Sequence, residues 1–188
     1  FCGFRQGLLW IVNPDDYEDT LDEWLGGHTA LIRCMPNTPA LLKSGMTALY
    51  ASPQASPAQQ ALAENILGAV GATIWLPQEA AMDAATAVSG SGPAYFFLVM
   101  EAMQEAAQTL GLDAETARQL TLQTALGAAQ MAIQGNLDPV TLRTNVTSPG
   151  GTTECAIQTL EDNHLRGIFQ QALQAAHDRS VALSEQFT

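Results

Sequence analysis

The chain has 188 residues, 47% of them hydrophobic, which is enough to bury a core in one large or two small domains. Its formal net charge of -12, with only seven Lys and Arg residues, would repel a phosphate backbone, so nucleic acid is not an expected partner. No apolar run approaches the length of about 18 residues that spans a bilayer, and no secretory signal opens the chain, so we expect no membrane association and a cytoplasmic location.

Cysteine and histidine side chains are scattered along the chain: Cys2, Cys34, Cys155, His28, His164 and His177. The odd number of cysteines and the lack of CxxC spacing fit a reducing compartment better than a disulfide framework. The histidines have neither HxxxH spacing nor a cysteine nearby, so we expect no metal site.

The first third of the chain alternates strand and helix patterns. Residues 30–34, 47–50 and 73–76 are short apolar runs that predict buried strands. Between the last two, Ser56 can cap a helix that begins at Pro57 and ends before Gly71. This order is typical of the end of an α/β domain.

After Pro77 the sequence predicts helices and no further strand. One helix begins at Pro93 and ends at Gly111, and a second is capped by Asp113 and ends at Gly135. A short helix follows Asp138, another follows residue 151, and the last covers about 165–186. These helices are rich in Ala and Gly and carry wide apolar stripes, which predict a core or a subunit interface.

Two glycine-containing segments, residues 89–94 and 147–153, are expected to be loops that lead into helices. Glycines let a backbone approach a ligand, and the first N–H groups of a helix favour a carboxylate or phosphate. The same segments could equally be ordinary capped turns. No GxSxG, GxxxxGK[ST] or GxGxxG motif occurs, so a hydrolase elbow, a P-loop and the main dinucleotide fingerprint are all missing.

Several strings together resemble pyrroline-5-carboxylate reductases. They are RCMPNTPA at 33–40, AVSGSGPAY at 87–95, QTALGAA at 123–129, NVTSPGGTT at 145–153 and Arg179-Ser180. Their order and spacing match that family over about residues 29–188. The resemblance implies reduction of 1-pyrroline-5-carboxylate to L-proline with NADPH or NADH.

The resemblance also implies a mostly helical fold in two parts. Residues 1–77 would be an α/β remnant of a Rossmann-like, dinucleotide-binding domain, with residues 1–28 atypical. Residues 78–188 would be an all-α dimerisation and substrate domain. The expected assembly is a homodimer, with dimers able to form a ring.

Four residues acquire expected roles from the same resemblance. Thr153 is similar to the threonine whose hydroxyl meets the substrate ring nitrogen, and Thr152 to a neighbour whose backbone holds the carboxylate. Asn145 looks like the asparagine that reaches the cofactor, and Glu79 like a residue lining the proline site. From the residues alone, Asn145 could be a turn residue and Glu79 an exposed carboxylate at a helix start.

Residues 1–20 match neither the first strand and glycine turn of the family nor its later cofactor loop, which predicts weak NADPH binding. A second hypothesis is therefore a non-catalytic helical dimerisation module. A third is a β-hydroxyacid-type dehydrogenase, whose catalysis relies on a lysine in its helical domain. The chain's single lysine, Lys43, precedes the helical segments, so this hypothesis ranks last.

Overall fold

The computed structural model of the chain describes residues 2–4, 9–12 and 30–184. The chain divides into two compact units, one formed by Phe1–Pro93 with Gln171–Thr188 and the other by Ala94–Gln170. We call them the sheet unit and the helical unit. The expected domain boundary at residue 77 differs from this division and stays a prediction.

The sheet unit is built on a mixed five-stranded sheet in the order β1-β2-β3-β4-β5. Its strands are β1 (Cys2–Phe4), β2 (Leu9–Val12), β3 (Ala30–Met35), β4 (Gly45–Ala51) and β5 (Gly71–Trp75). The pairs β2–β3 and β4–β5 are parallel, whereas β1–β2 and β3–β4 are antiparallel. The three strands predicted after residue 29 are confirmed, and β1 and β2 were not predicted.

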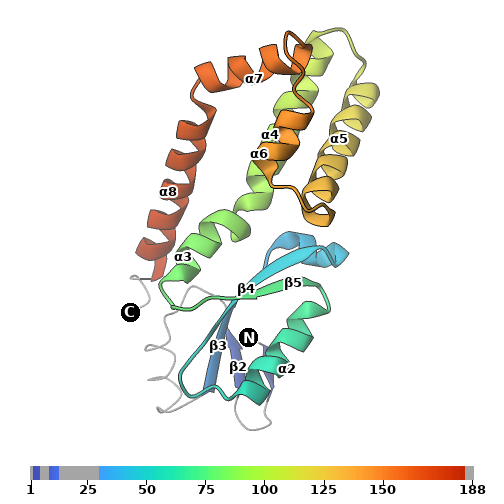
Figure 1. The fold of residues 1–188 in the computed structure, drawn as a ribbon. Helices are drawn as coiled ribbons and strands as arrows, with labels where there is room; N and C mark the ends of the chain where they lie inside the picture. Colours follow the sequence, from blue (N-terminus) through green and yellow to red (C-terminus); the bar gives the residue numbers. More distant parts are fainter. Residues whose placement is uncertain (1, 5–8, 13–29, 185–188) are drawn as a thin grey trace. The chain divides into compact units, whose positions relative to one another are not determined.

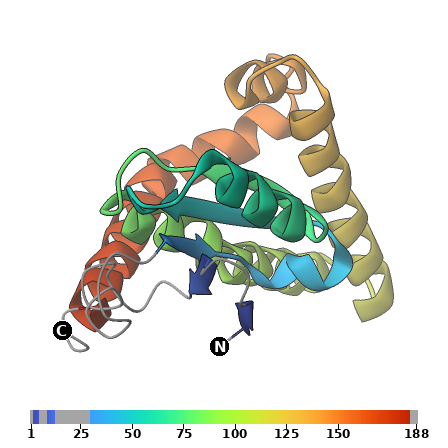
Figure 2. The same ribbon diagram turned by 90° about the horizontal axis from the view of Figure 1, so that it is seen from below.

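The core of the sheet unit lies on β3, β4 and the helix α2 (Pro57–Gly68). Ile32 and Leu49 are fully buried and cluster with Cys34 and Ala63. Helix α2 lies along the sheet next to β5 (Figures 1 and 2). Burial raises the pKa of the Cys34 thiol to about 11, which keeps this thiol protonated and inert at neutral pH.

The predicted start of α2 is confirmed in detail. Ser56 accepts a hydrogen bond from the Gln59 backbone N–H, and the Gln59 side chain accepts one from the Ser56 N–H. This reciprocal capping box satisfies two donors that the first turn of a helix leaves free. Between β3 and β4, a short 3-10 helix, η1 (Thr38–Leu42), ends at Lys43 in the left-handed region.

A nearly continuous helix follows β5, and it corrects the expectation of a loop at residues 89–94. It consists of α3 (Ala81–Ala85), the π-helical turn η2 (Thr86–Gly90) and α4 (Gly92–Thr109). The Ser91 N–H donates to the Thr86 carbonyl oxygen at 2.9 Å, a bond that closes one π turn. The backbone through Gly90 and Gly92 therefore stays helical, with one wider turn, instead of forming a loop.

The remaining helices are α5 (Ala114–Gln134), α6 (Pro139–Asn145), α7 (Thr152–Asp162) and α8 (Leu165–Ser184). The predicted caps are confirmed, because Asp113 accepts from the Thr116 N–H and Asp138 from the N–H groups of Val140 and Thr141. Residues 185–186, expected in the last helix, lie outside the described residues. No helix in the described part of the chain is long and apolar enough to cross a membrane.

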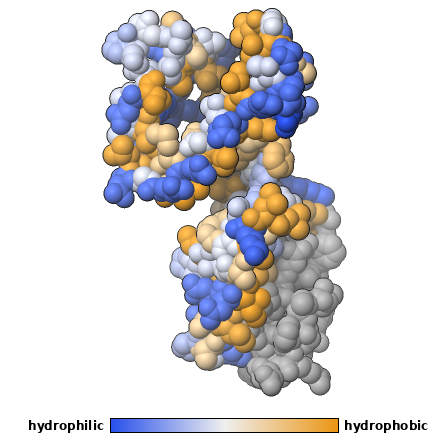
Figure 3. All heavy atoms as spheres, turned by 90° about the vertical axis from the view of Figure 1, so that its right-hand side faces the viewer, coloured by the Kyte–Doolittle hydropathy of each residue, from blue (hydrophilic) through white to orange (hydrophobic). Residues whose placement is uncertain are grey.

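The helical unit buries very little of its own surface. Of residues 94–170, all of which are described, only Ala117 and Thr121 are buried. Large apolar side chains such as Phe96, Phe97 and Leu98 are more than 60% exposed. Figure 3 shows apolar residues, in orange, spread over the surface of the helices.

Two glycines offer a matched test of the sheet unit. A Cβ at Gly71 would lie 2.0 Å from the Gly45 carbonyl oxygen, whereas a Cβ at Gly68 would meet nothing within 4 Å. Gly71→Ala should therefore destabilise the chain by about 2 kcal/mol or more, because backbone must move. Gly68→Ala should stabilise it by about 0.5–1 kcal/mol, because alanine favours a helix. Urea unfolding measures both, and equal effects would contradict the β4–β5 pairing.

Candidate functional site

Glu79, in the turn between β5 and α3, is held by a charged side chain buried in the sheet. Arg33 is 2% exposed, and its Nη1 donates to Glu79 Oε1 at 2.5 Å. Removing one member of such a pair leaves a buried charge without compensation, which is strongly unfavourable. Glu79 is therefore not the fully exposed helix-start carboxylate that local sequence allowed.

A second polar contact joins α3 to α8 within the sheet unit. The Ser180 hydroxyl donates to Asp83 Oδ1 at 2.7 Å, and both residues are at least partly buried. Asp83 is 6% exposed, so this hydrogen bond replaces water that the carboxylate loses on folding. The contact gives a physical reason for a serine near the end of the chain.

A third contact joins the segment after β3 to the π-helical turn. Asn37 Nδ2 donates to the carbonyl oxygen and to the hydroxyl of Ser89, at 3.2 and 3.3 Å, and Asn37 Oδ1 accepts from the Met46 N–H at 2.9 Å. Two of the strings singled out in the sequence, around residues 37 and 89, thus meet in the sheet unit.

In the helical unit, residues 146–151 connect α6 to α7 and are tightly wound. The Thr147 hydroxyl donates to the Arg143 carbonyl oxygen at 2.6 Å, and the Gly151 N–H donates to the Ser148 carbonyl oxygen at 3.0 Å. Gly150 has a φ of 71°, a left-handed conformation that glycine adopts without strain. The Glu154 carboxylate turns back and accepts from the Gly150 N–H at 2.7 Å.

The start of α7 presents the N–H groups of Thr152, Thr153 and Glu154 without acceptors from within the helix. The helix begins after Gly151, which has no side chain to cap it. Thr152 is exposed and Thr153 is partly exposed. Such a helix start favours a carboxylate, and the Glu154 side chain supplies one negative charge beside it already.

The four predicted site residues fall in two groups. Thr152, Thr153 and Asn145 flank the connection from α6 to α7, with Asn145 exposed as the last residue of α6. Glu79 belongs to the sheet unit. Their roles stay predictions. Arg33, Asn37 and Asp83 were missed as partners in this region, although an arginine inside the apolar run of β3 is a signal for a buried ion pair.

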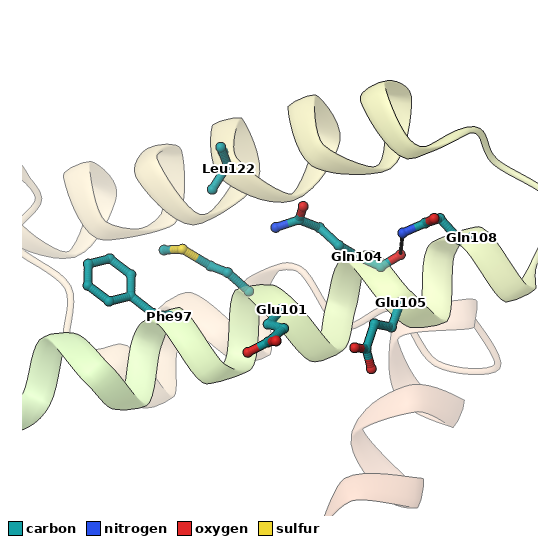
Figure 4. A pocket seen from close by; sticks show the side chains of 7 residues that line it. Phe97, Glu101, Gln104, Glu105, Gln108 and Leu122 are labelled. Carbon is teal, nitrogen blue, oxygen red and sulfur yellow. Dashed lines mark hydrogen bonds between the residues drawn. The ribbon is translucent and has the colours of Figure 1, made fainter.

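The helical unit has a shallow groove on α4 facing α5, shown in Figure 4. Phe97 and Gln104 point from α4 toward α5, whose Leu122 points back, while Glu101 and Glu105 point away. Its lining is mixed apolar and polar and lacks clustered catalytic groups. Within the described residues, no three His, Cys, Asp or Glu side chains gather as metal ligands would.

The comparisons with known families decide what these segments belong to. Residues 79–183 match the family model for pyrroline-5-carboxylate reductase dimerisation. The chain belongs to the pyrroline-5-carboxylate reductase family. A second model, for a GAD-like domain, matches residues 1–52, a smaller share of the chain.

Individual family members agree with this assignment. The pyrroline-5-carboxylate reductase of Pseudomonas aeruginosa is 56% identical over 167 residues, which are 89% of this chain and 61% of that protein. The chain thus spans less than two thirds of that relative. A solved pyrroline-5-carboxylate reductase from Coxiella burnetii matches with a TM-score of 0.92 and 47% identity, over 95% of this chain and 67% of that one.

The structural likeness to the Coxiella burnetii protein covers both units of the chain. A more distant solved relative is the pyrroline carboxylate reductase of Plasmodium falciparum with NADP bound. It matches with a TM-score of 0.84 and 30% identity, over 90% of this chain and 68% of that one. The family assignment therefore holds for the sheet unit as well as for the helical unit.

The cap that begins α6 should respond to acid. Hydrogen bonds from the Thr141 hydroxyl and backbone, and from the Val140 N–H, hold the pKa of Asp138 below its ordinary value. A lowered folded-state pKa stabilises α6 above the unfolded pKa of about 3.9, and this contribution is lost as pH falls through the folded value. The Val140 and Thr141 amide NMR signals should therefore titrate below about pH 4.

Asp138→Asn is the control, because its side chain still accepts hydrogen bonds and does not titrate in this range. An acid titration of the same size in that variant would show that another group is responsible. A midpoint at or above the ordinary aspartate value would contradict the cap.

Proposed function

We propose that this chain carries the substrate-binding and dimerisation part of a pyrroline-5-carboxylate reductase. The reaction is reduction of 1-pyrroline-5-carboxylate to L-proline with NADPH or NADH in proline biosynthesis. The observation that carries the proposal is the start of α7, where N–H groups without helical acceptors lie beside Thr152 and Thr153 in the string shared with the family. Relatives up to 56% identical support it by their names.

The chemistry of the substrate fits this helix start. It carries one carboxylate and one cyclic imine, so it needs an anion cradle and a hydrogen-bonding group for the ring nitrogen. The N–H groups of Thr152 and its neighbours would hold the carboxylate, and the Thr153 hydroxyl would bond the ring nitrogen. Reduction of an imine needs orientation and exclusion of water more than it needs a nucleophile.

A bound nicotinamide cofactor supplies the hydride in this reaction. Asn145, exposed at the end of α6, is the residue proposed to reach it. The sequence has no GxGxxG fingerprint and few basic residues, so its residues fit only part of a dinucleotide site. The named relatives, among them a solved one with NADP bound, support use of a nicotinamide cofactor at the level of the family.

Glu79 is proposed to line the proline site, with its carboxylate oriented by Arg33. The ion pair holds one carboxylate oxygen, so Glu79 would act by shaping the site and setting its charge. A general-acid role is not assigned to it.

A non-catalytic dimerisation module is the second candidate. The exposed apolar helices favour it, whereas the string at residues 145–153 favours the reductase. A β-hydroxyacid-type dehydrogenase is disfavoured, because Lys43 lies at the end of η1 in the sheet unit and not in the helical unit. The cytoplasmic location stays a prediction.

In a full-length relative or a reconstituted form that retains this string, Thr153→Ala should lower kcat/KM for proline-dependent reduction of NAD(P)⁺ by about ten- to a hundredfold, the effect of losing one oriented hydrogen bond of about 1.5–3 kcal/mol. Thr153→Ser should keep most of the activity, and the melting temperature should stay nearly unchanged in both. Thr159→Ala is the matched control, because its hydroxyl bonds the Cys155 carbonyl oxygen on the exposed side of the same helix.

Unfolding of Thr153→Ala, or normal turnover by it, would show that Thr153 serves the helix and not the substrate. If the unmodified chain does not turn over while it still binds proline, the helix start would be retained without the reductase activity. Absence of both would favour the dimerisation module.

We infer a homodimer, with rings of dimers as the larger assembly that the resemblance implies. The matched dimerisation model and the exposed Phe96, Phe97 and Leu98 support it. Apolar surface of this kind is normally covered by a partner in soluble proteins.

Light scattering at micromolar concentration should therefore give twice the chain mass of 20.0 kDa. Phe97→Glu should raise the monomer fraction, because it puts a charge on the apolar surface of α4. Gln108→Glu, which adds the same charge at the other end of the groove, should leave the dimer nearly intact. A monodisperse monomer of the unmodified chain would refute the homodimer.

A further inference from the structure

The π-helical turn at Thr86–Gly90, here called the π-turn, is hydrogen-bonded to the segment that follows β3. Asn37 holds it through the Ser89 carbonyl oxygen and hydroxyl, at 3.2 and 3.3 Å. The other side of the Asn37 amide accepts from the Met46 N–H at 2.9 Å, so the side chain bridges the start of β4 and the π-turn. Both polar atoms of the amide are engaged by protein groups.

A packing contact reinforces this bridge one residue further along. A Cβ placed at Gly90 would lie 2.2 Å from Met35 Cε, so the Met35 side chain occupies the space that a larger residue would need. Met35 and Asn37 come from one string of the sequence, and Ser89 and Gly90 from another. The two strings are therefore in direct contact, Met35 with Gly90 and Asn37 with Ser89.

The π-turn determines how the helix continues. In an α-helix the Ser91 N–H would bond to residue 87, but here it bonds to the Thr86 carbonyl oxygen at 2.9 Å. A π-turn amounts to one extra residue in the helix. An α-turn in its place would shift every following α4 residue by about 100° around the helix axis. The π-turn thus sets the helical register in which α4 begins.

We propose that Asn37 is a positioning residue that fixes the π-helical register at the start of the dimerisation segment. By holding this register, it supports assembly through the segment that matches the dimerisation model. The π-turn lies within residues 79–183, which match the dimerisation model, whereas Asn37 lies outside them. Asn37 therefore acts, from outside the matched segment, on the helical register within it.

Asn37→Asp separates the two halves of the bridge. The carboxylate still accepts from the Met46 N–H but cannot donate to Ser89, and its charge faces the Ser89 carbonyl oxygen. Hydrogen exchange of the Ser91 amide, measured by NMR, should become about tenfold faster or more, because the π-turn loses the hydrogen bonds that Asn37 donates to Ser89. Amides of α2 should keep their protection. Asn136→Asp, at an exposed loop position, is the matched control and should change neither set.

A second variant keeps the proposal testable if Asn37→Asp does not fold. Ser89→Ala removes only the 3.3 Å contact and introduces a good helix former, so the chain should fold. Its Ser91 amide should exchange faster, by a smaller factor than in Asn37→Asp. Unchanged exchange at Ser91 in a folded Asn37→Asp, or in Ser89→Ala when the former is unfolded, would overturn the proposal.

The monomer fraction is a second measurement, and it would not change if Asn37 only stabilised the π-turn locally. Asn37→Asp should raise the monomer fraction in light scattering, although residue 37 lies outside the dimerisation segment, and Asn136→Asp should not. A local loss of protection with an unchanged dimer would limit Asn37 to bracing and overturn its role in assembly. The light-scattering measurement rests on the proposed homodimer, whereas the amide-exchange measurement does not. A monomeric unmodified chain would therefore refute the homodimer without affecting the exchange result.

Discussion

The attachment of α3 and the π-turn to the segment around β3, within the sheet unit, is the constraint on which the rest of that unit depends. Two polar contacts make this attachment, Arg33 with Glu79 and Asn37 with Ser89, and a third, Ser180 with Asp83, joins α3 to α8. Each costs desolvation and is favourable only while both partners are present. The sheet core itself is modest, so these contacts specify how the helix is attached more than they add to its burial.

The helical unit follows a different physical logic. Its helices make few contacts with one another and bury almost none of their own apolar side chains. The local caps at Asp113 and Asp138 define where two of these helices begin. A short helix is only marginally stable by itself, however, and in a protein most of its stability comes from packing against other elements. The residues that match the dimerisation model therefore carry an apolar surface that the proposed homodimer would cover.

The connection between α6 and α7 combines both kinds of constraint. Its shape comes from short-range hydrogen bonds, those of Thr147 with Arg143 and of Gly150 with Glu154, so it needs little support from distant residues. The chemistry proposed for it rests on backbone N–H groups and threonine hydroxyls. A strongly acidic chain with seven basic residues can therefore still offer a site for a carboxylate.

The sequence by itself determined the elements whose causes are local. The Ser56, Asp113 and Asp138 caps lie within three residues of their partners, and the buried strands after residue 29 follow from apolar runs. Only the tertiary structure decided that residues 86–90 form a π-turn. The glycine and serine residues in this segment are typical of a loop, and the contacts that Asn37 makes with Ser89 and Met35 with Gly90 come from a distant part of the sequence. The partners of Glu79, Ser89 and Ser180 lie 46, 52 and 97 residues away, and no local pattern encodes which distant side chain will meet a buried polar group.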